Sequence, residues 1–159
     1  MTAQLAITGD DILLKALRKV SSPATRREIL DTLGSYGVSS TQQRFREKKT
    51  PEGASWKESR RASQGGQTLR DRNYLYRSLS YLASDKSVEW GTNLIYAAIH
   101  QFGGIIRPKN GGVLVFQGLN GFVFTKKVTI PARPYMGINN DDRSEMGELI
   151  KDYLGRAFQ

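Results

Sequence analysis

Apolar residues recur every three to four positions near both ends of the chain, which is the spacing of one face of an α-helix. At the N-terminal end this pattern predicts two helices within residues 8–48, the second entered through a serine cap with Pro23 in its first turn. Gly34 and Gly37 lie inside the second helix, where each lowers helix stability by ~1 kcal/mol relative to alanine. We therefore expect both glycines to admit another backbone at close range.

The last helix is predicted over residues 141–158, because its apolar positions form a single stripe. Asp142 and Glu145 have the spacing of a capping box at its start. The adjacent Asp141 and Asp142 also offer the oxygen donors that a hard cation prefers. Because the helix dipole favours carboxylates at a helix start, we interpret the pair as a cap rather than a metal site.

The periodicity changes in the middle of the chain. Three leucines share one face of a short helix predicted over residues 74–82. Apolar and polar residues then alternate over 87–92, which predicts a strand. A second short helix is predicted over 93–102, and Gly103 is expected to end it by adopting a positive φ.

Two further strands are predicted over residues 113–116 and 122–130, joined by a glycine-containing hairpin. With them, residues 86–138 form the sheet part of the chain. The predicted fold class is α+β, with N-terminal helices, a small antiparallel sheet that contains a β-hairpin and a short inserted helix, and a C-terminal amphipathic helix. Because 159 residues fit one domain, we expect a single domain over 1–159.

Composition narrows the chemistry. Cysteine is absent, which excludes a disulfide framework, thiolate zinc sites and thiol nucleophiles. The chain starts without a basic stretch followed by an apolar one, so no signal peptide is predicted. No apolar run approaches the ~20 residues of a membrane helix. We expect a soluble protein, made in the cytoplasm, without a membrane partner.

The formal net charge of +9 predicts attraction to polyanions or to acidic protein surfaces, although charge also keeps proteins soluble. Residues 44–72, the basic tract, hold nine basic and four acidic residues and so more than half of the net charge. Their cations could release counterions from nucleic acid. Within the tract, Trp56 is interpreted as a core or interface anchor, and residues 59–68 as a mobile surface loop.

Catalytic templates are missing from the sequence. It holds no phosphate-binding loop, nucleophile elbow or paired-histidine zinc motif. His100 is the single histidine, and the nearest acids in sequence, Glu89 and Asp141, are not placed to orient it as a base. We expect it to hydrogen-bond a backbone carbonyl or a neighbouring subunit, and predict neither an enzyme nor a cofactor or metal site.

Several sequence elements occur in one order: Arg44-Phe45, Thr50-Pro51-Glu52-Gly53-x-x-Trp56, Leu75-x-x-Ser78-Leu79, Gly91-Thr92-Asn93-x-x-Tyr96-Ala97-x-Ile99-His100-Gln101-Phe102-Gly103-Gly104 and Ile130-Pro131-Ala132-Arg133-Pro134-Tyr135-Met136-Gly137. With them the chain resembles the virion morphogenesis (tail completion) proteins of Mu-like and related tailed bacteriophages, over roughly residues 40 to 140. One departure is Arg72-Asn73-Tyr74, where such proteins usually show a Thr-Gly pair before the leucine. Asparagine can adopt the left-handed conformation, so the turn can survive.

The resemblance implies a non-enzymatic neck protein of the virion, made in the host cytoplasm. Such proteins look like ring formers, often of six copies, that cap the tail tube and form the head–tail joining interface. The implied partners are further copies of the chain, the tail tube protein and the head–tail connector or neck proteins. The basic tract adds non-specific contact with packaged DNA as a further candidate interaction.

A closed ring needs two different adhesive faces on each subunit. Candidates for subunit contacts come from the two long motifs: Tyr96, Ile99, His100, Phe102, Ile130, Arg133 and Tyr135. We expect Pro131 and Pro134 to stiffen the second motif and present Arg133 and Tyr135. Candidates for lining a DNA channel or docking a partner are basic: Arg60, Arg61, Arg70, Arg107 and Lys109. The two long motifs are expected to lie close together.

Two alternatives stay open. A non-specific nucleic-acid-binding module would use the basic tract and bind DNA with strong salt dependence. A hydrolase would use His100 and would need a carboxylate within hydrogen-bond reach of its ring.

Overall fold

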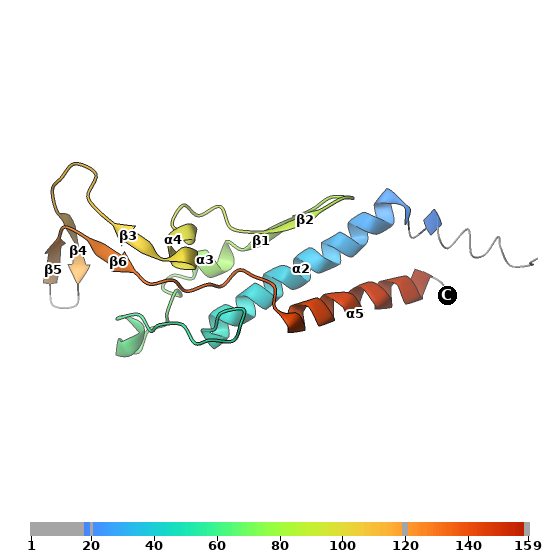
Figure 1. Ribbon diagram of the computed structural model, residues 1–159, viewed down its shortest axis with the longest axis horizontal. Helices are drawn as coiled ribbons and strands as arrows, with labels where there is room; N and C mark the ends of the chain where they lie inside the picture. Colours follow the sequence, from blue (N-terminus) through green and yellow to red (C-terminus); the bar gives the residue numbers. More distant parts are fainter. Residues whose placement is uncertain (1–17, 20, 119–120, 158–159) are drawn as a thin grey trace, which may run out of the picture. The chain divides into compact units, whose positions relative to one another are not determined.

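The computed structural model describes residues 18–19, 21–118 and 121–157, and within them it is an α+β protein (Figure 1). The helices are α2 (Pro23–Glu47), the 3-10 helix η1 (Ala62–Gln64), α3 (Tyr74–Arg77), α4 (Ala97–Phe102) and α5 (Asn140–Ala157). The strands are β1 (Ser80–Ala83), β2 (Val88–Gly91), β3 (Gly104–Ile106), β4 (Leu114–Gly118), β5 (Gly121–Thr125) and β6 (Val128–Ile130). The predicted fold class is confirmed. Most of the first predicted helix lies outside the described residues.

The strands form three separate two-stranded antiparallel ladders, β1–β2, β3–β6 and β4–β5, rather than the one small sheet that was predicted. The described residues belong to two compact units. Unit 1 takes its residues from 1–40, 80–91 and 138–159, and unit 2 comprises 41–79 and 92–137. The single domain over the whole chain stays a prediction.

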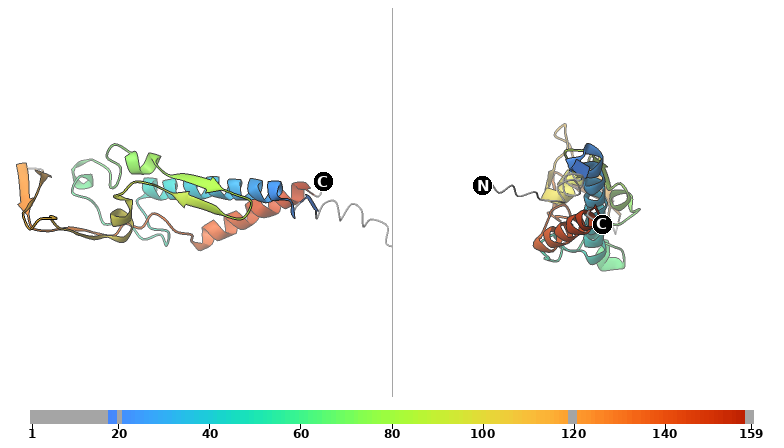
Figure 2. Two further views of the ribbon diagram at one scale, coloured as in Figure 1. Left: turned by 90° about the horizontal axis from the view of Figure 1, so that it is seen from above. Right: turned by 90° about the vertical axis from the view of Figure 1, so that its right-hand side faces the viewer.

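The first part of α2 is the centre of unit 1, with the β1–β2 hairpin and α5 beside it (Figures 1 and 2). Near the start of α2, Glu28 accepts a hydrogen bond from the Tyr153 hydroxyl near the end of α5. Further along α2, Ser40 Oγ donates to Asp142 Oδ1 at 2.5 Å near the start of α5. The two helices are therefore antiparallel.

The two glycines of α2 make room for aromatic rings of the hairpin. A Cβ added at Gly37 would lie 2.7 Å from atoms of the Trp90 ring, and one at Gly34 would lie 2.8 Å from Val88 and against the Tyr81 ring. Another segment does approach Gly34 and Gly37 closely, as predicted. The prediction that the approaching atoms belong to a backbone is wrong. Side chains of β1 and β2 fill the slots, because a ring fits only where the helix carries no side chain.

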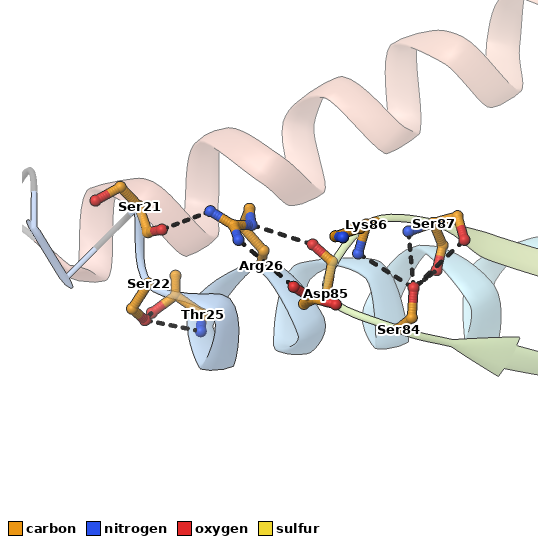
Figure 3. A network of polar contacts seen from close by, with 8 residues as sticks. All are labelled: Ser21, Ser22, Thr25, Arg26, Ser84, Asp85, Lys86 and Ser87. Carbon is orange, nitrogen blue, oxygen red and sulfur yellow. Dashed lines mark hydrogen bonds and ion pairs between the residues drawn. The ribbon is translucent and has the colours of Figure 1, made fainter.

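Polar contacts join the tip of the hairpin to the start of α2 (Figure 3). Ser22 Oγ accepts from the backbone N–H of Thr25 at 3.1 Å, which confirms the predicted serine cap. Arg26 donates to the carbonyl oxygens of Ser21 at 2.6 Å and of Asp85, in the β1–β2 turn, at 3.1 Å. The Arg26–Asp85 ion pair is half-exposed and adds little, so the carbonyl contacts give this junction its geometry.

The cap of α5 is built by residues other than those predicted. The Asp142 N–H donates to Asn139 Oδ1 at 2.7 Å, and the Asn139 N–H donates to Asp142 Oδ2 at 2.8 Å. The capping box is therefore Asn139–Asp142 and not Asp142–Glu145, because α5 begins at Asn140 and Asp142 already lies in its first turn. Asp142 is buried and also accepts from the Tyr36 hydroxyl. Burial, and then the Asp142 carboxylate, raise the pKa of Tyr36.

The predicted helix over 74–82 is wrong beyond its first turn. α3 ends at Arg77, and the following residues pair with β2 as strand β1. Leu75 and Leu79 are buried, but Leu82 is 76% exposed. Pairing with β2 therefore overrides the helical spacing of the leucines. Asn73 does adopt the expected left-handed conformation, with φ 60°.

Other boundaries also move. The helix predicted over 93–102 starts only at Ala97, and Gly103 has the expected positive φ of 71°. The strand predicted over 122–130 is two strands, because β5 pairs with β4 while β6 pairs with β3, which the sequence pattern missed. The predicted β4–β5 hairpin is confirmed up to its turn, which lies outside the described residues. The surface loop predicted over 59–68 contains η1.

The buried hydrophobic residues of the described part all belong to unit 2: Phe45, Trp56, Leu75, Leu79, Ala97 and Tyr135. The Phe45 ring is the centre of this core. Its centroid lies 5.0 Å from that of Tyr135 and 5.4 Å from that of Trp56, the latter in an edge-to-face arrangement. Trp56 was predicted to be a core or an interface anchor, and the structure shows that it is a core residue.

We predict that Gly37→Ala lowers the free energy of unfolding by about 1–2 kcal/mol, because overlap with the Trp90 ring outweighs the gain in helix propensity. Gly147→Ala is the matched control. An added Cβ there, inside α5, meets no atom within 4 Å, so this variant should gain about 1 kcal/mol. Urea denaturation of both variants measures the difference. Equal stabilisation by the two changes would contradict the packing role of Gly37.

Candidate functional site

Residues 131–137, which we call the strap, run between β6 and α5 without belonging to a helix or strand. A lone extended segment has no ladder partner for its N–H and C=O groups, so other parts of the protein must satisfy them. The strap lies against the motif that ends in α4 and β3. The Arg133 N–H donates to the His100 carbonyl at 2.8 Å, and Ile130 pairs with Gly104. The expected proximity of the two long motifs is confirmed within the chain.

Gln101 holds the centre of the strap. Its Oε1 accepts from the backbone N–H of Tyr135 at 2.9 Å and of Met136 at 3.0 Å. Its Nε2 donates to the Met136 carbonyl at 3.0 Å. One amide side chain therefore imitates a strand partner for two consecutive residues.

Two more side chains, from earlier in the chain than Gln101, donate hydrogen bonds to carbonyl groups of the strap. Arg44 Nη1, from the end of α2, donates to the carbonyls of Tyr135 at 3.1 Å and Gly137 at 2.8 Å. Trp56 Nε1 donates to the Pro134 carbonyl at 2.8 Å. Arg44 is buried, so this member of the basic tract is a structural residue and offers no charge to DNA.

Gly103 allows the strap to pass closely over the end of α4. A Cβ added at Gly103 would lie 2.7 Å from the backbone nitrogen of Ala132 and 3.0 Å from the Ile130 carbonyl oxygen. Its φ of 71° is also unfavourable for other residues. Glycine is required here for both reasons.

Beside the strap, unit 2 contains a pocket of about 400 Å³, which we call the Arg133 pocket. Its lining includes Arg133, His100, Arg61, Arg70 and Arg72, together with Asp71, Leu69, Leu75, Tyr74 and Tyr96. Arg133 also lines a second pocket, of about 600 Å³, which Arg60, Lys127 and Phe116 share. The Arg133 side chain is only 6% exposed, and its Nε donates to the Lys57 carbonyl at 2.7 Å.

His100 is half-buried at this pocket. Its Nδ1 is buried and has no hydrogen-bond partner among the described residues, so the expected bond to a carbonyl of the same chain is not found there. The ring stacks edge-to-face with Tyr96, at 6.0 Å between centroids. Burial, and then the positive charge of Arg133, lower the pKa of His100. The ring is therefore neutral near pH 7.

The predicted subunit-contact residues have unequal exposure. Phe102 is 77% exposed and Tyr96 39% exposed, while Ile99 and Ile130 are half-buried. The expectation that two prolines present Arg133 and Tyr135 is wrong, because Arg133 is 6% and Tyr135 1% exposed. The Tyr135 hydroxyl donates to the Ala97 carbonyl at 3.1 Å, and burial raises its pKa. A role of these residues in subunit contacts stays a prediction.

The basic residues predicted to line a DNA channel or dock a partner do not lie at one site. Arg61, which forms an ion pair with Asp71, and Arg70 lie together in the Arg133 pocket. The Arg70 guanidinium also lies 4.6 Å from the centroid of the Tyr76 ring. Arg60 lines the second pocket. Arg107 and Lys109 are exposed and line neither.

The sequence interpretation missed Gln101 and Arg44 as holders of the strap, although both stand in the quoted motifs. Nothing in their spacing shows which backbone they reach. Within the described ranges, no three His, Cys, Asp or Glu side chains gather as metal ligands. Over the same ranges, no helix is both long and apolar enough to cross a bilayer.

We predict that Gln101→Ala lowers the free energy of unfolding by about 2–4 kcal/mol, because it leaves strap N–H and C=O groups without partners. Gln101→Glu keeps the acceptor for both N–H groups but turns a carboxylate oxygen toward the Met136 carbonyl, so it should recover only part of the stability that Gln101→Ala loses. Gln64→Ala, at an exposed position in η1, should change stability by less than about 0.5 kcal/mol. Chemical denaturation measures all three. Equal effects of Gln101→Ala and Gln64→Ala would rule out this role.

The lowered pKa of His100 predicts that the stability of the protein depends on pH. Its pKa in the folded protein lies below the ordinary value of 6.5, so the unfolded chain binds the proton first as pH falls. The stability contributed by the neutral ring is present above about pH 6.5 and is lost as pH falls through the folded pKa. Between about pH 7.5 and about pH 5, the wild type should therefore lose more stability than His100→Gln. Parallel pH profiles of the two proteins would contradict this.

Comparison with known proteins places the chain among phage proteins. The model of the phage virion morphogenesis family matches residues 9–155. The chain is also 34% identical, over 89 residues, to the Mu-like prophage FluMu G protein 2 of Haemophilus influenzae. That alignment covers 56% of this chain and 53% of the relative, so the chain spans about half the relative's length. No solved structure matches the chain. Because the family match covers nearly all of the sequence, the chain belongs to the phage virion morphogenesis family.

Proposed function

We propose that this protein is a tail-completion (terminator-type) protein that caps the tail tube as a ring and forms the head–tail joining interface in the virion neck. A structural role in phage virion morphogenesis follows from the family. The ring, with six copies as the expected number, and the contacts to the tail tube and the head–tail connector are the proposed part. One observation carries it: unit 2 has apolar surfaces that nothing in the described chain covers.

The first such surface is one face of the β4–β5 hairpin. Val115 pairs with Phe124 and Gln117 with Phe122, so these four side chains share a face. Phe122 is 69%, Phe124 67% and Val115 53% exposed. An isolated two-stranded hairpin is marginally stable in water, and large exposed apolar patches mark interaction sites. We name this surface the hairpin face.

The second surface surrounds α4. Ile95, just before this helix, is 97% exposed, and Phe102, at its end, is 77% exposed. Ile105 in the following strand is 55% exposed. We name this surface the α4 face. It differs from the hairpin face in shape and sequence, which is what a head-to-tail contact between copies requires.

The nucleic-acid alternative rests on fewer charges than the sequence suggested. Arg44 is buried against strap carbonyls, Arg61 is paired with Asp71, and Arg70 packs on Tyr76. The cations that stay exposed for non-specific contact with packaged DNA in this proposal are Arg46, Lys48, Lys49, Lys57, Arg60 and Arg72 of the basic tract, together with Arg107 and Lys109.

We predict that Phe122→Ser/Phe124→Ser weakens self-association at least tenfold, because each phenylalanine contributes roughly 1.5–3 kcal/mol when buried. The folded monomer should keep its stability, since both side chains are exposed in it. The measurement is light scattering, together with electron microscopy of rings on purified tail tubes.

Leu82→Ser/Ile138→Ser is the matched control, because these side chains are 76% and 43% exposed and lie outside both faces and outside the Arg133 pocket. It should assemble like the wild type. Unchanged assembly of the phenylalanine variant would refute the role of the hairpin face. A wild type that stays monomeric with tail tubes and binds DNA tightly at moderate salt would favour the nucleic-acid alternative.

A further inference from the structure

We propose that the Arg133 pocket binds a carboxylate side chain from an acidic segment of a protein partner. The proposal concerns a polar pocket rather than the two apolar faces. It stands whether or not the protein forms a ring.

The main observation is an uncompensated buried charge. Arg133 is only 6% exposed, yet among the described residues it forms no ion pair and a single side-chain hydrogen bond, from Nε to the Lys57 carbonyl. Buried charges are normally paired, because desolvating an ion without a counter-ion is costly. A guanidinium held through Nε keeps both Nη groups for an end-on, two-pronged contact, the geometry that matches a carboxylate.

His100 supplies a second unpaired group at the same pocket. Its Nδ1 is buried without a partner, in a ring near enough to Arg133 to feel its charge. Arg72 lines the pocket from an exposed position and has no ion pair or hydrogen bond within the described residues. The other two arginines are engaged, Arg61 by Asp71 and Arg70 by Asn73. Arg133, His100 and Arg72 are therefore the groups left to receive an anion.

The lining favours a protein carboxylate over a nucleic-acid phosphate. Duplex DNA is a rod whose closely spaced phosphates suit rows of exposed cations. Here the principal cation is buried inside a pocket of about 400 Å³, which suits one inserted side chain. Tyr74, Tyr96 and Leu75 surround it, and tyrosine with arginine is the composition typical of protein-binding hot spots. Asp71 on the rim also opposes a polyanionic backbone.

The single histidine makes the proposal testable by NMR, because one set of imidazole signals reports on the pocket. We would titrate the labelled full chain with a capped hexaglutamate peptide, a capped hexaglutamine peptide, inorganic phosphate and duplex DNA, at one moderate ionic strength. The hexaglutamate peptide should shift the His100 signals saturably, and hexaglutamine should not.

Variants then locate the contact. Arg133→Gln should weaken peptide binding roughly tenfold or more, and Arg72→Gln about two- to fivefold, as expected for a buried and an exposed ion pair. Lys127→Gln removes the same charge from the second pocket only and should leave binding unchanged. If Arg133→Gln fails to fold by circular dichroism, the exposed Arg72 variant decides.

Several results would overturn the proposal. They are the absence of a His100 shift with hexaglutamate, equal shifts with hexaglutamine, and loss of binding in Lys127→Gln but not in Arg72→Gln. Saturation by DNA but not by the peptide would assign the pocket to nucleic acid instead. Saturation by phosphate alone would show that only a small anion fits.

Discussion

The backbone of the strap is the constraint on which unit 2 depends. Residues 131–137 have no ladder partner, so their polar groups take hydrogen bonds from side chains and carbonyls elsewhere in the unit. Gln101 and Arg44 supply most of them, and each reaches the strap from a different helix. Once these bonds form, Tyr135 must lie against Phe45 at the centre of the core. The strap thereby joins the end of α2 to α4.

This arrangement also explains the placement of charge and apolar surface. The buried hydrophobic core of the described residues is small. Polar side chains give the strap the hydrogen bonds that a neighbouring strand would give it in a sheet. Arg44 is compensated by carbonyl oxygens, whereas Arg133 is buried with one such contact. Several aromatic and branched side chains remain outside the core, on the hairpin face and the α4 face. In the proposed ring, these groups are available for contacts between molecules.

Local features of the fold were predictable because their hydrogen bonds close within a few residues. The serine cap before α2, the β4–β5 hairpin and the positive φ of Gly103 follow from neighbouring residues alone. Predictions failed where pairing with another strand overrides the local pattern. β3 pairs with β6, which lies beyond the β4–β5 hairpin in the chain. β1 pairs with β2 across a short turn, and this pairing overrides the helical spacing of the leucines around Leu79. The α5 cap moved by three residues because Asn139 also satisfies the spacing rule.

The sequence by itself determined the α+β class, the family, the approximate helices and the two motifs that meet. It also placed glycine at Gly37 and Gly103, where the fold has no room for a side chain. Only the tertiary structure decided that Arg133 and Tyr135 are buried, although the pattern had suggested that they are presented. The physical reason is sequence distance: Gln101 and Arg44 lie 34 and 91 residues from Tyr135, and no local pattern specifies which backbone a polar side chain will satisfy.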